Sequence, residues 1–234
     1  MKMPHSPINK FRVALPWLIA WGIIYAIIIF AGIFAQESFF LGAVKVASIF
    51  LCFVYATVYF PRDRLLILAL FLTCLADLFL AFNNTSIPGL IVFVLAQLVH
   101  LVRFDWARYS EAIILFSAAA IIMITLALIF RFAEPIYVVC SFYAVTLTLN
   151  LIASLRWRND DPKNLHAKLA FYGFALFASC DICTGISFLS KIYLLPAHLY
   201  TPANFFVWFF YYPAQILISN SAKCATIEPK EGKR

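Results

Sequence analysis

Four ionisable side chains interrupt the long apolar runs of this sequence: Lys45, Asp77, His100 and Asp181. The runs approach the ~20 residues that a helix needs to cross the hydrocarbon of a bilayer. An ionisable group at that depth is costly unless it is paired or hydrated, so each one is a functional hypothesis by default. Two carboxyl groups can divide acid and base work between them, which makes the two aspartates the candidate catalytic residues.

Depth places three of these groups at one level. Asp77 follows Arg64 by thirteen residues, and Asp181 follows Lys168 by thirteen. At 1.5 Å per helical residue, both carboxyl groups lie roughly 20 Å above the basic end of their helix. Lys45, on a helix that runs the other way, reaches a similar level. The sequence therefore predicts a shared polar cavity that holds two acids and a base. His100, three residues before Arg103, lies nearer the basic end of its own helix.

Neutral polar residues accompany them. Gln97, Tyr212 and Gln215 are candidates, together with Lys45 and His100, for binding substrate or tuning the electrostatics of the site. Each also has a plainer interpretation. Glutamines in membrane helices most often make interhelical hydrogen bonds. Lys45 and Asp77 could form a structural ion pair, and His100 could be a packing residue.

Other chemistries fit the sequence poorly. Zinc sites need three or four His, Cys or carboxylate ligands, and only one histidine lies inside the apolar runs. The motifs GxSxG, HExxH and the P-loop do not occur. The six cysteines lie in or directly after apolar runs and are expected to be packing residues. We expect no metal and no cofactor.

The composition defines the elements that must position these residues. The 234 residues are 64% hydrophobic and only 12% charged. A soluble domain is about a quarter charged, so the composition excludes a soluble enzyme and a nucleic-acid-binding protein. It predicts an all-α, polytopic membrane protein with the lipid bilayer as its surroundings.

Eight apolar runs are long enough to be transmembrane helices of one bundle. They cover residues 13–34, 38–60, 65–82, 87–104, 110–130, 136–155, 167–190 and 204–222. The whole chain, 1–234, is predicted to be one integral membrane domain, with a short basic tail at 223–234. No prediction of oligomeric state follows.

The basic residues predict the orientation. With the N-terminus in the cytoplasm, most of the 18 Lys and Arg residues fall on the cytoplasmic side, and the outer connections keep Arg131 and Lys191. Cytoplasmic loops carry such an excess of positive charge. Both termini are therefore predicted to be cytoplasmic, in the inner membrane if the protein is bacterial. The net charge of +7 is then explained mostly by the basic residues on the cytoplasmic side.

A weak internal repeat relates the two halves of the chain. An Asp follows small residues in both 74–79 and 179–183, and an Ala-Gln pair recurs at 96–97 and 214–215. The pattern suggests two parallel four-helix halves that meet at a central site.

Four segments carry a resemblance to a known family. They are LTCLADLFL (72–80), FVLAQLVH (93–100), ALFASCD (175–181) and YYPAQILI (211–218). In order and spacing they resemble the YhhN-like lysoplasmalogenase family over about residues 40–221, and Lys45 matches a lysine early in the family's second span. The chain departs from the family pattern at Ala76, where Gly is usual, and at Gln97, where His is usual.

The resemblance implies a membrane hydrolase that cleaves the vinyl-ether bond of a lysophospholipid, the lysoplasmalogen, to a fatty aldehyde and a glycerophospho-headgroup. Vinyl ethers hydrolyse by protonation at carbon followed by capture of the cation by water, which suits a pair of carboxyl groups as in glycosidases. Asp77, if beside Lys45, would be the ionised partner and Asp181 the acid, although the roles could be reversed. The alternatives are a small-solute transporter and a non-catalytic lipid-binding membrane protein.

Overall fold

The computed structural model describes residues 7–34, 39–82, 86–104, 135–191 and 194–223, with single positions at 114, 117, 118, 121 and 125. These residues form helices and short turns, without strands. The α-helices are α1 (Pro7–Phe34), α2 (Phe39–Tyr59), α3 (Arg64–Phe82), α4 (Ile87–Phe104), α6 (Pro135–Asp160), α7 (Leu165–Lys191) and α8 (Tyr200–Ser219), with a short 3₁₀ helix η2 (Ala197–Leu199) before α8. The all-α prediction is confirmed for the described part of the chain.

Five of these helices contain a stretch that is long and apolar enough to cross a membrane. The stretches are Gly42–Tyr59, Arg64–Ala81, Ile87–Phe104, Val138–Asp160 and Leu165–Lys191, and α1 adds a shorter apolar segment, Pro16–Ala31. Such helices satisfy their backbone hydrogen bonds internally, as hydrocarbon requires. The chain is therefore a multi-pass membrane protein.

Seven of the eight expected runs coincide with helices, and the run at 110–130 lies almost wholly outside the described residues. The helix α8 is not among the five apolar ones, because its tyrosines, prolines and Gln215 lower its average hydropathy. The count of eight spans and the division into two parallel halves stay predictions.

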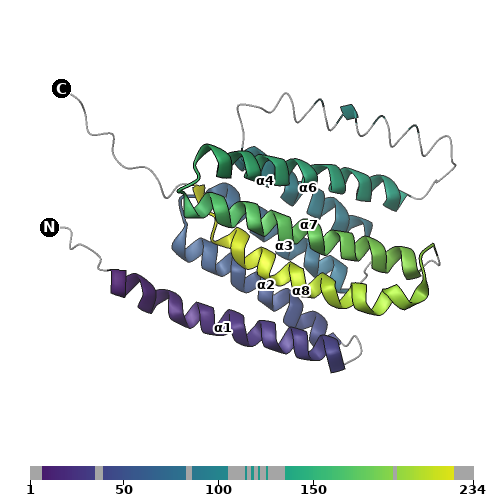
Figure 1. The fold of residues 1–234 in the computed structure, drawn as a ribbon, viewed down its shortest axis with the longest axis horizontal. Coiled ribbons are helices and arrows are strands. Elements are labelled where there is room, and N and C mark those ends of the chain that lie inside the picture. The colour runs from purple at the N-terminus through teal and green to yellow at the C-terminus, as the bar shows by residue number, and fades with distance from the viewer. Residues whose placement is uncertain are drawn as a thin grey trace.

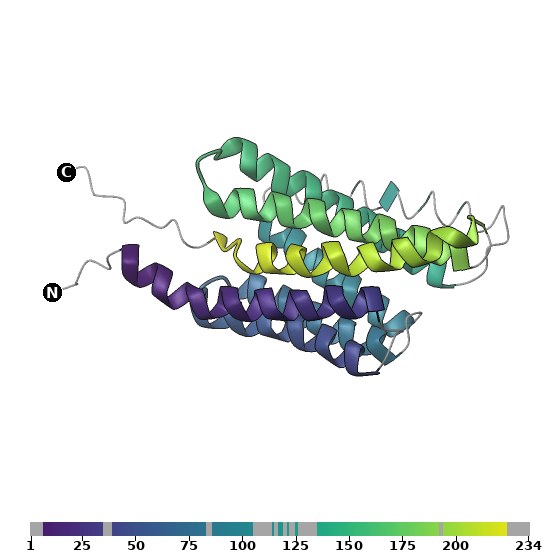
Figure 2. The same ribbon diagram turned by 60° about the horizontal axis from the view of Figure 1, so that its bottom comes forward.

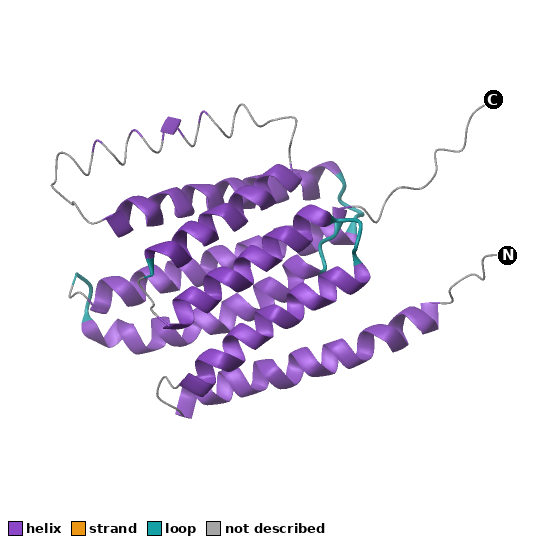
Figure 3. Cartoon of the chain, turned by 180° about the vertical axis from the view of Figure 1, so that it is seen from behind, coloured by secondary structure: helices purple, strands orange, loops and turns teal. Residues whose placement is uncertain are grey.

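The helices form one elongated bundle (Figure 1), in which helices that follow each other in the chain run in opposite directions, except that α4 and α6 run the same way. The start of α1 and the end of α8 lie at the same end of it. Helix α8 lies in the middle, between α7 on one side and α1 on the other (Figure 2). The described turns gather at the two ends of the bundle (Figure 3). Helix α8 thus lies among other helices, and its side chains can reach several of them.

Small residues let α7 and α8 approach closely. A Cβ atom at Gly173 would lie 2.8 Å from Cγ1 of Ile218 and 3.2 Å from the carbonyl oxygen of Ala214. Ala170, one turn earlier on α7, is fully buried. Membrane helices associate through such small-residue contacts, because lipid supplies no hydrophobic drive between them. The contact fixes the position of α8 against the helix that carries Asp181.

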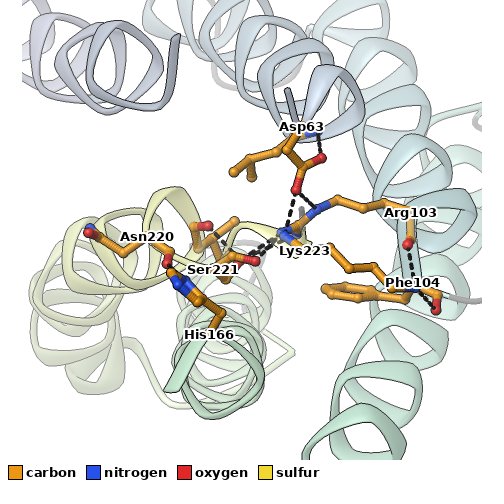
Figure 4. Close-up of polar contacts among 9 residues, drawn as sticks. Asp63, Arg103, Phe104, His166, Asn220, Ser221 and Lys223 are labelled. Atoms are coloured by element: carbon orange, nitrogen blue, oxygen red, sulfur yellow. Dashed lines mark hydrogen bonds and ion pairs between the residues drawn. The ribbon is translucent and has the colours of Figure 1, made fainter. Parts of the chain in front are cut away.

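A polar network closes the bundle at the end where α1 begins (Figure 4). Oδ2 of Asp63, in the α2–α3 turn, accepts hydrogen bonds from Nε of Arg103 at 3.0 Å and from the backbone N–H of Lys223 at 2.8 Å. Its Oδ1 accepts the backbone N–H of Leu66 at 3.1 Å, which caps the start of α3. The Arg103 guanidinium also donates to the carbonyl and hydroxyl oxygens of Ser221. We call this set the Asp63–Arg103 network.

The same end joins two further segments. Nζ of Lys223 donates to the carbonyls of Arg103 and Phe104 at 3.1 and 2.9 Å, and so satisfies the C-terminus of α4. Nδ1 of His166, at the start of α7, lies 2.7 Å from the carbonyl oxygen of Asn220. The connections that the sequence assigns to the cytoplasmic side therefore meet at one end. Which side of the membrane this end faces stays a prediction.

Candidate active site

Each candidate aspartate is held by a tyrosine of a facing helix. The hydroxyl of Tyr211 on α8 donates to Oδ2 of Asp77 on α3, and the hydroxyl of Tyr143 on α6 donates to Oδ2 of Asp181 on α7. Both O···O distances are 2.6 Å, within the range of charge-assisted hydrogen bonds. Both aspartates are partly exposed. An acid at this depth is expected to face a hydrated or ligand-filled space, because exposure to lipid is costly.

A row of aromatic rings links the two aspartate–tyrosine pairs. Tyr143 lies 5.6 Å from Phe93, Phe93 lies 6.0 Å from Phe177, and Phe177 lies 5.5 Å from Tyr211, measured between ring centroids. Four helices, α3, α6, α7 and α8, thus supply the two pairs, while Phe93 of α4 packs between them. The two pairs border one aromatic core.

Lys45 contacts a tryptophan that packs against Tyr211, the partner of Asp77. Its Nζ is 4.3 Å from the centroid of the Trp208 ring, in a cation–π contact. Trp208 packs edge-on against Tyr211 at 5.2 Å. Lys45 therefore contacts the same face of α8 that holds Asp77. A direct contact between Lys45 and a carboxyl group stays a prediction.

Gln97 and His100 lie on the buried face of α4. Nδ2 of Asn150, on α6, donates to the backbone oxygen and to Oε1 of Gln97, at 2.7 and 2.8 Å. The structure thus gives Gln97 an interhelical hydrogen bond, the plainer of its two interpretations. His100 packs edge-on against Phe174 at 5.2 Å, and its Nδ1 has no hydrogen-bond partner among the described residues.

Tyr212 and Gln215 are buried on α8. The ring of Tyr212 lies 6.2 Å from Tyr25 of α1, on a different face from Tyr211. Within the described part of the chain, the Tyr212 hydroxyl and the Gln215 Nε2 have no hydrogen-bond partner. The tyrosine that contacts Asp77 is Tyr211, whereas the sequence singled out its neighbour Tyr212 as a candidate for binding substrate or tuning the electrostatics.

The family comparison covers this whole arrangement. The model of the YhhN family matches residues 40–222. The chain belongs to the YhhN family. The matched region contains every candidate residue from Lys45 to Gln215 and leaves out α1. Neither the curated proteins nor the solved structures contain a match.

Within this YhhN-family chain, sequence reasoning missed the two tyrosines that hold the aspartates. A signal for Tyr143 was present, since Tyr143, Thr146 and Asn150 repeat at helical spacing along one side of α6. Polar residues that line one face of an apolar helix point toward a partner. Tyr211 had no comparable signal, because it lies in the aromatic run WFFYY at 208–212, where any ring could face the site.

No group of three or more His, Cys, Asp or Glu residues that could hold a metal ion occurs among the described residues. Cys180 and Cys183 of the CxxC segment have free thiols. The functional groups gathered here are therefore carboxyl, phenol and amide groups with one ammonium. That set can move protons and bind an anion.

Proposed function

We propose that this YhhN-family protein is a membrane-embedded hydrolase that cleaves the vinyl-ether bond of a lysoplasmalogen, releasing a fatty aldehyde and a glycerophospho-headgroup. One observation carries the proposal: Asp77 and Asp181 each accept a 2.6 Å hydrogen bond from a tyrosine, at the border of one aromatic core. Membership in the YhhN family supports it.

The reaction needs one proton donor and one proton acceptor. A carboxylic acid transfers its proton to the β-carbon of the vinyl ether, and the double-bond electrons form the new C–H bond. The resulting oxocarbenium ion is stabilised by the second, ionised carboxylate. That carboxylate takes a proton from water as the water oxygen bonds to the cationic carbon. The hemiacetal then collapses to the aldehyde and the glycerol hydroxyl: the first carboxyl group, now ionised, takes the proton of the hemiacetal hydroxyl, and the second gives its proton to the departing glycerol oxygen, which restores both groups.

The tyrosines position the carboxyl groups. Each phenol engages Oδ2, and we propose that the other oxygen, Oδ1, exchanges the proton with substrate or water. A carboxyl group held in one orientation reacts faster than a freely rotating one, because its orientation is already set. We assign the acid to Asp181 and the base to Asp77, and the reversed assignment uses the same geometry.

The remaining candidates have supporting roles in this proposal. Gln215 and Tyr212, with polar atoms buried on α8, are proposed to orient water or the glycerol hydroxyl. Gln97 and His100 are proposed to support the site from α4, through packing and the bond to Asn150. Lys45 takes no part in these steps. The proposed steps use only these protein groups and water.

The test compares three lysophospholipids of equal chain length in purified, folded protein: the vinyl ether, the saturated ether and the ester. We expect aldehyde release from the vinyl ether and no turnover of the saturated ether, which has no double bond to protonate. Equal turnover of the ester would indicate an ordinary lysophospholipase. No turnover of any of them would favour the transporter or the lipid-binding alternative.

We also propose that both termini face the cytoplasm, since the basic connections meet at the end of the bundle where α1 begins (Figure 1). Reporter fusions after Arg12, Asn84, Asp161 and Lys230 should read inside, outside, inside and inside. An outside reading at Lys230 would contradict the count of eight spans.

A further inference from the structure

The contact between Lys45 and Trp208 has no part in the acid–base steps above. Lys45 is partly buried on α2, and its ammonium lies over the Trp208 ring of α8. A lysine within a membrane span is costly and points to an ion or substrate pathway by default. The chemistry that an ammonium recognises is an anion.

This ammonium is connected to Asp77 through two aromatic residues of α8. Trp208 and Tyr211 are three residues apart on α8 and so share one face of it. Their rings pack edge-on at 5.2 Å, and Tyr211 donates to Asp77. Lys45 and Asp77 come from neighbouring helices, α2 and α3, which pack on each other. Axes of packed helices are about 8–10 Å apart, which sets the scale of the separation.

The proposed substrate has an anion at a matching distance from its reactive bond. Six bonds separate the phosphorus of a lysoplasmalogen from the vinyl-ether carbon that water attacks, on which the proposed base Asp77 acts. At ~1.5 Å per bond with tetrahedral bends, an extended glycerol unit spans about 7–8 Å. A lipid whose vinyl ether lies at Asp77 can therefore place its phosphate near the next helix.

We propose that Lys45, oriented by the Trp208 ring, is the phosphate subsite of this active site. The inference rests on the proposed function and adds the recognition of the headgroup. The ammonium binds the phosphate diester oxygens, and the tryptophan face holds the lysine side chain in place by the cation–π contact. The subsite makes the enzyme selective for alkenyl lipids that carry a phosphate.

The kinetic test uses two substrates of equal chain length, a lysoplasmalogen and the 1-alkenylglycerol that lacks the phosphate. Lys45→Met should lower kcat/KM for the lysoplasmalogen about 10- to 100-fold, mainly through KM, because it removes a charge-assisted contact. The same change should leave the alkenylglycerol within about twofold. Lys45→Arg should restore most of the loss, and Lys168→Met, an exposed lysine at the start of α7, is the matched control.

A binding test works without turnover. The saturated-ether lysophospholipid should bind less tightly to Lys45→Met than to the wild-type protein, and an alkylglycerol should bind both equally. If the wild-type protein hydrolyses nothing but this difference persists, the subsite stands and the proposed reaction falls. Equal binding of the phospholipid to both proteins overturns the subsite, whatever the turnover.

Two further results would overturn the proposal. An equal loss of kcat/KM for both substrates in Lys45→Met would assign Lys45 to the chemistry or to the fold. Displacement of the saturated-ether lipid from the wild-type protein by millimolar inorganic phosphate, with potassium chloride at equal ionic strength without effect, would indicate a site for free phosphate. Retention of the lipid under both salts supports the headgroup assignment.

Discussion

Two aspartates, one just before α3 and one in its second half, differ in burial and in their hydrogen-bond partners. Asp63, directly before the helix, is 4% exposed, pairs with Arg103 and accepts two backbone N–H groups. Asp77, thirteen residues past the start of α3, is partly exposed and accepts one tyrosine hydroxyl. Asp181 on α7 repeats the second condition with Tyr143. Among the described residues, Asp63 thus has hydrogen bonds to both of its carboxylate oxygens, whereas Asp77 has one hydrogen bond, to Oδ2.

This difference in hydrogen bonding indicates different roles for the aspartates. A carboxylate that bonds a buried guanidinium and two backbone N–H groups holds three segments of the chain together, and loss of one partner leaves a buried charge unpaired. A carboxyl group with one phenol on Oδ2 can exchange a proton through its other oxygen. Under the proposed function, Asp63 therefore serves the fold, while Asp77 and Asp181 are the groups that react.

The largest expected effect follows from removing the reactive carboxyl groups. Asp77→Asn and Asp181→Asn should each lower aldehyde release at least about 100-fold, because proton donation and charge stabilisation each contribute about that much. The double variant should be little worse than either single one, since both groups act on one transition state. Aldehyde release by equal amounts of protein, shown to be folded by its thermal transition, is the measurement.

The comparison would break if either single variant kept wild-type activity. In that case the tyrosine-held aspartates would be packing residues, and the site would have to be sought elsewhere in the bundle.

The second effect is on stability. Arg103→Met leaves Asp63 buried without its cation, and loss of one partner of a buried pair costs about 3–5 kcal/mol. A clear fall in thermal-unfolding temperature in detergent should result, while kcat of the protein that remains folded should change less than about threefold. Arg64→Met, an exposed arginine at the start of α3, is the matched control and should leave the unfolding temperature almost unchanged. A large loss of kcat with normal stability would place the network in the reaction.

The sequence could predict two of these three aspartates as special, but not the third. Asp77 and Asp181 stood out because each is an isolated charge in an apolar run. Asp63 lies in the charged turn PRDR at 61–64, where solvent exposure is the ordinary expectation, so its burial was missed. That burial depends on Arg103 and Lys223, which are distant in sequence and meet only in the folded bundle.

The helices were easier to predict from the sequence than the contacts between them. Apolar length predicted seven helices with ends that differ by up to about six residues, since membrane spans are specified locally. The choice of Tyr211 over Tyr212 is different, because it depends on the rotation of α8. The close approach at Gly173 helps to fix that rotation, and no local pattern encodes it.

A smaller effect should come from the tyrosines. Tyr143→Phe and Tyr211→Phe keep the rings in the aromatic row and remove one hydrogen bond from each aspartate. A hydrogen bond to a charged group contributes about 1.5–3 kcal/mol, so kcat should fall about 10- to 100-fold with little change in KM. Tyr212→Phe removes a hydroxyl from the other face of α8 and should affect kcat less than either. An equal loss in all three would mean that the phenols act through packing and not through the aspartates.

The smallest effect concerns Gln97, the position at which the chain departs from the family pattern. Asn150 donates both to the side chain and to the backbone oxygen of Gln97, and the backbone bond survives any substitution. Gln97→Ala should therefore lower aldehyde release only a fewfold, because it removes positioning and not a proton donor. Gln97→His, which restores the residue usual in the family, should leave activity equal or higher, since an imidazole nitrogen can still accept from Asn150. Measured beside Asp77→Asn, a loss from Gln97→Ala as large as that of the aspartate would move the reactive centre from the tyrosine-held carboxyl groups toward α4, and would erase the distinction between the groups that react and those that position them.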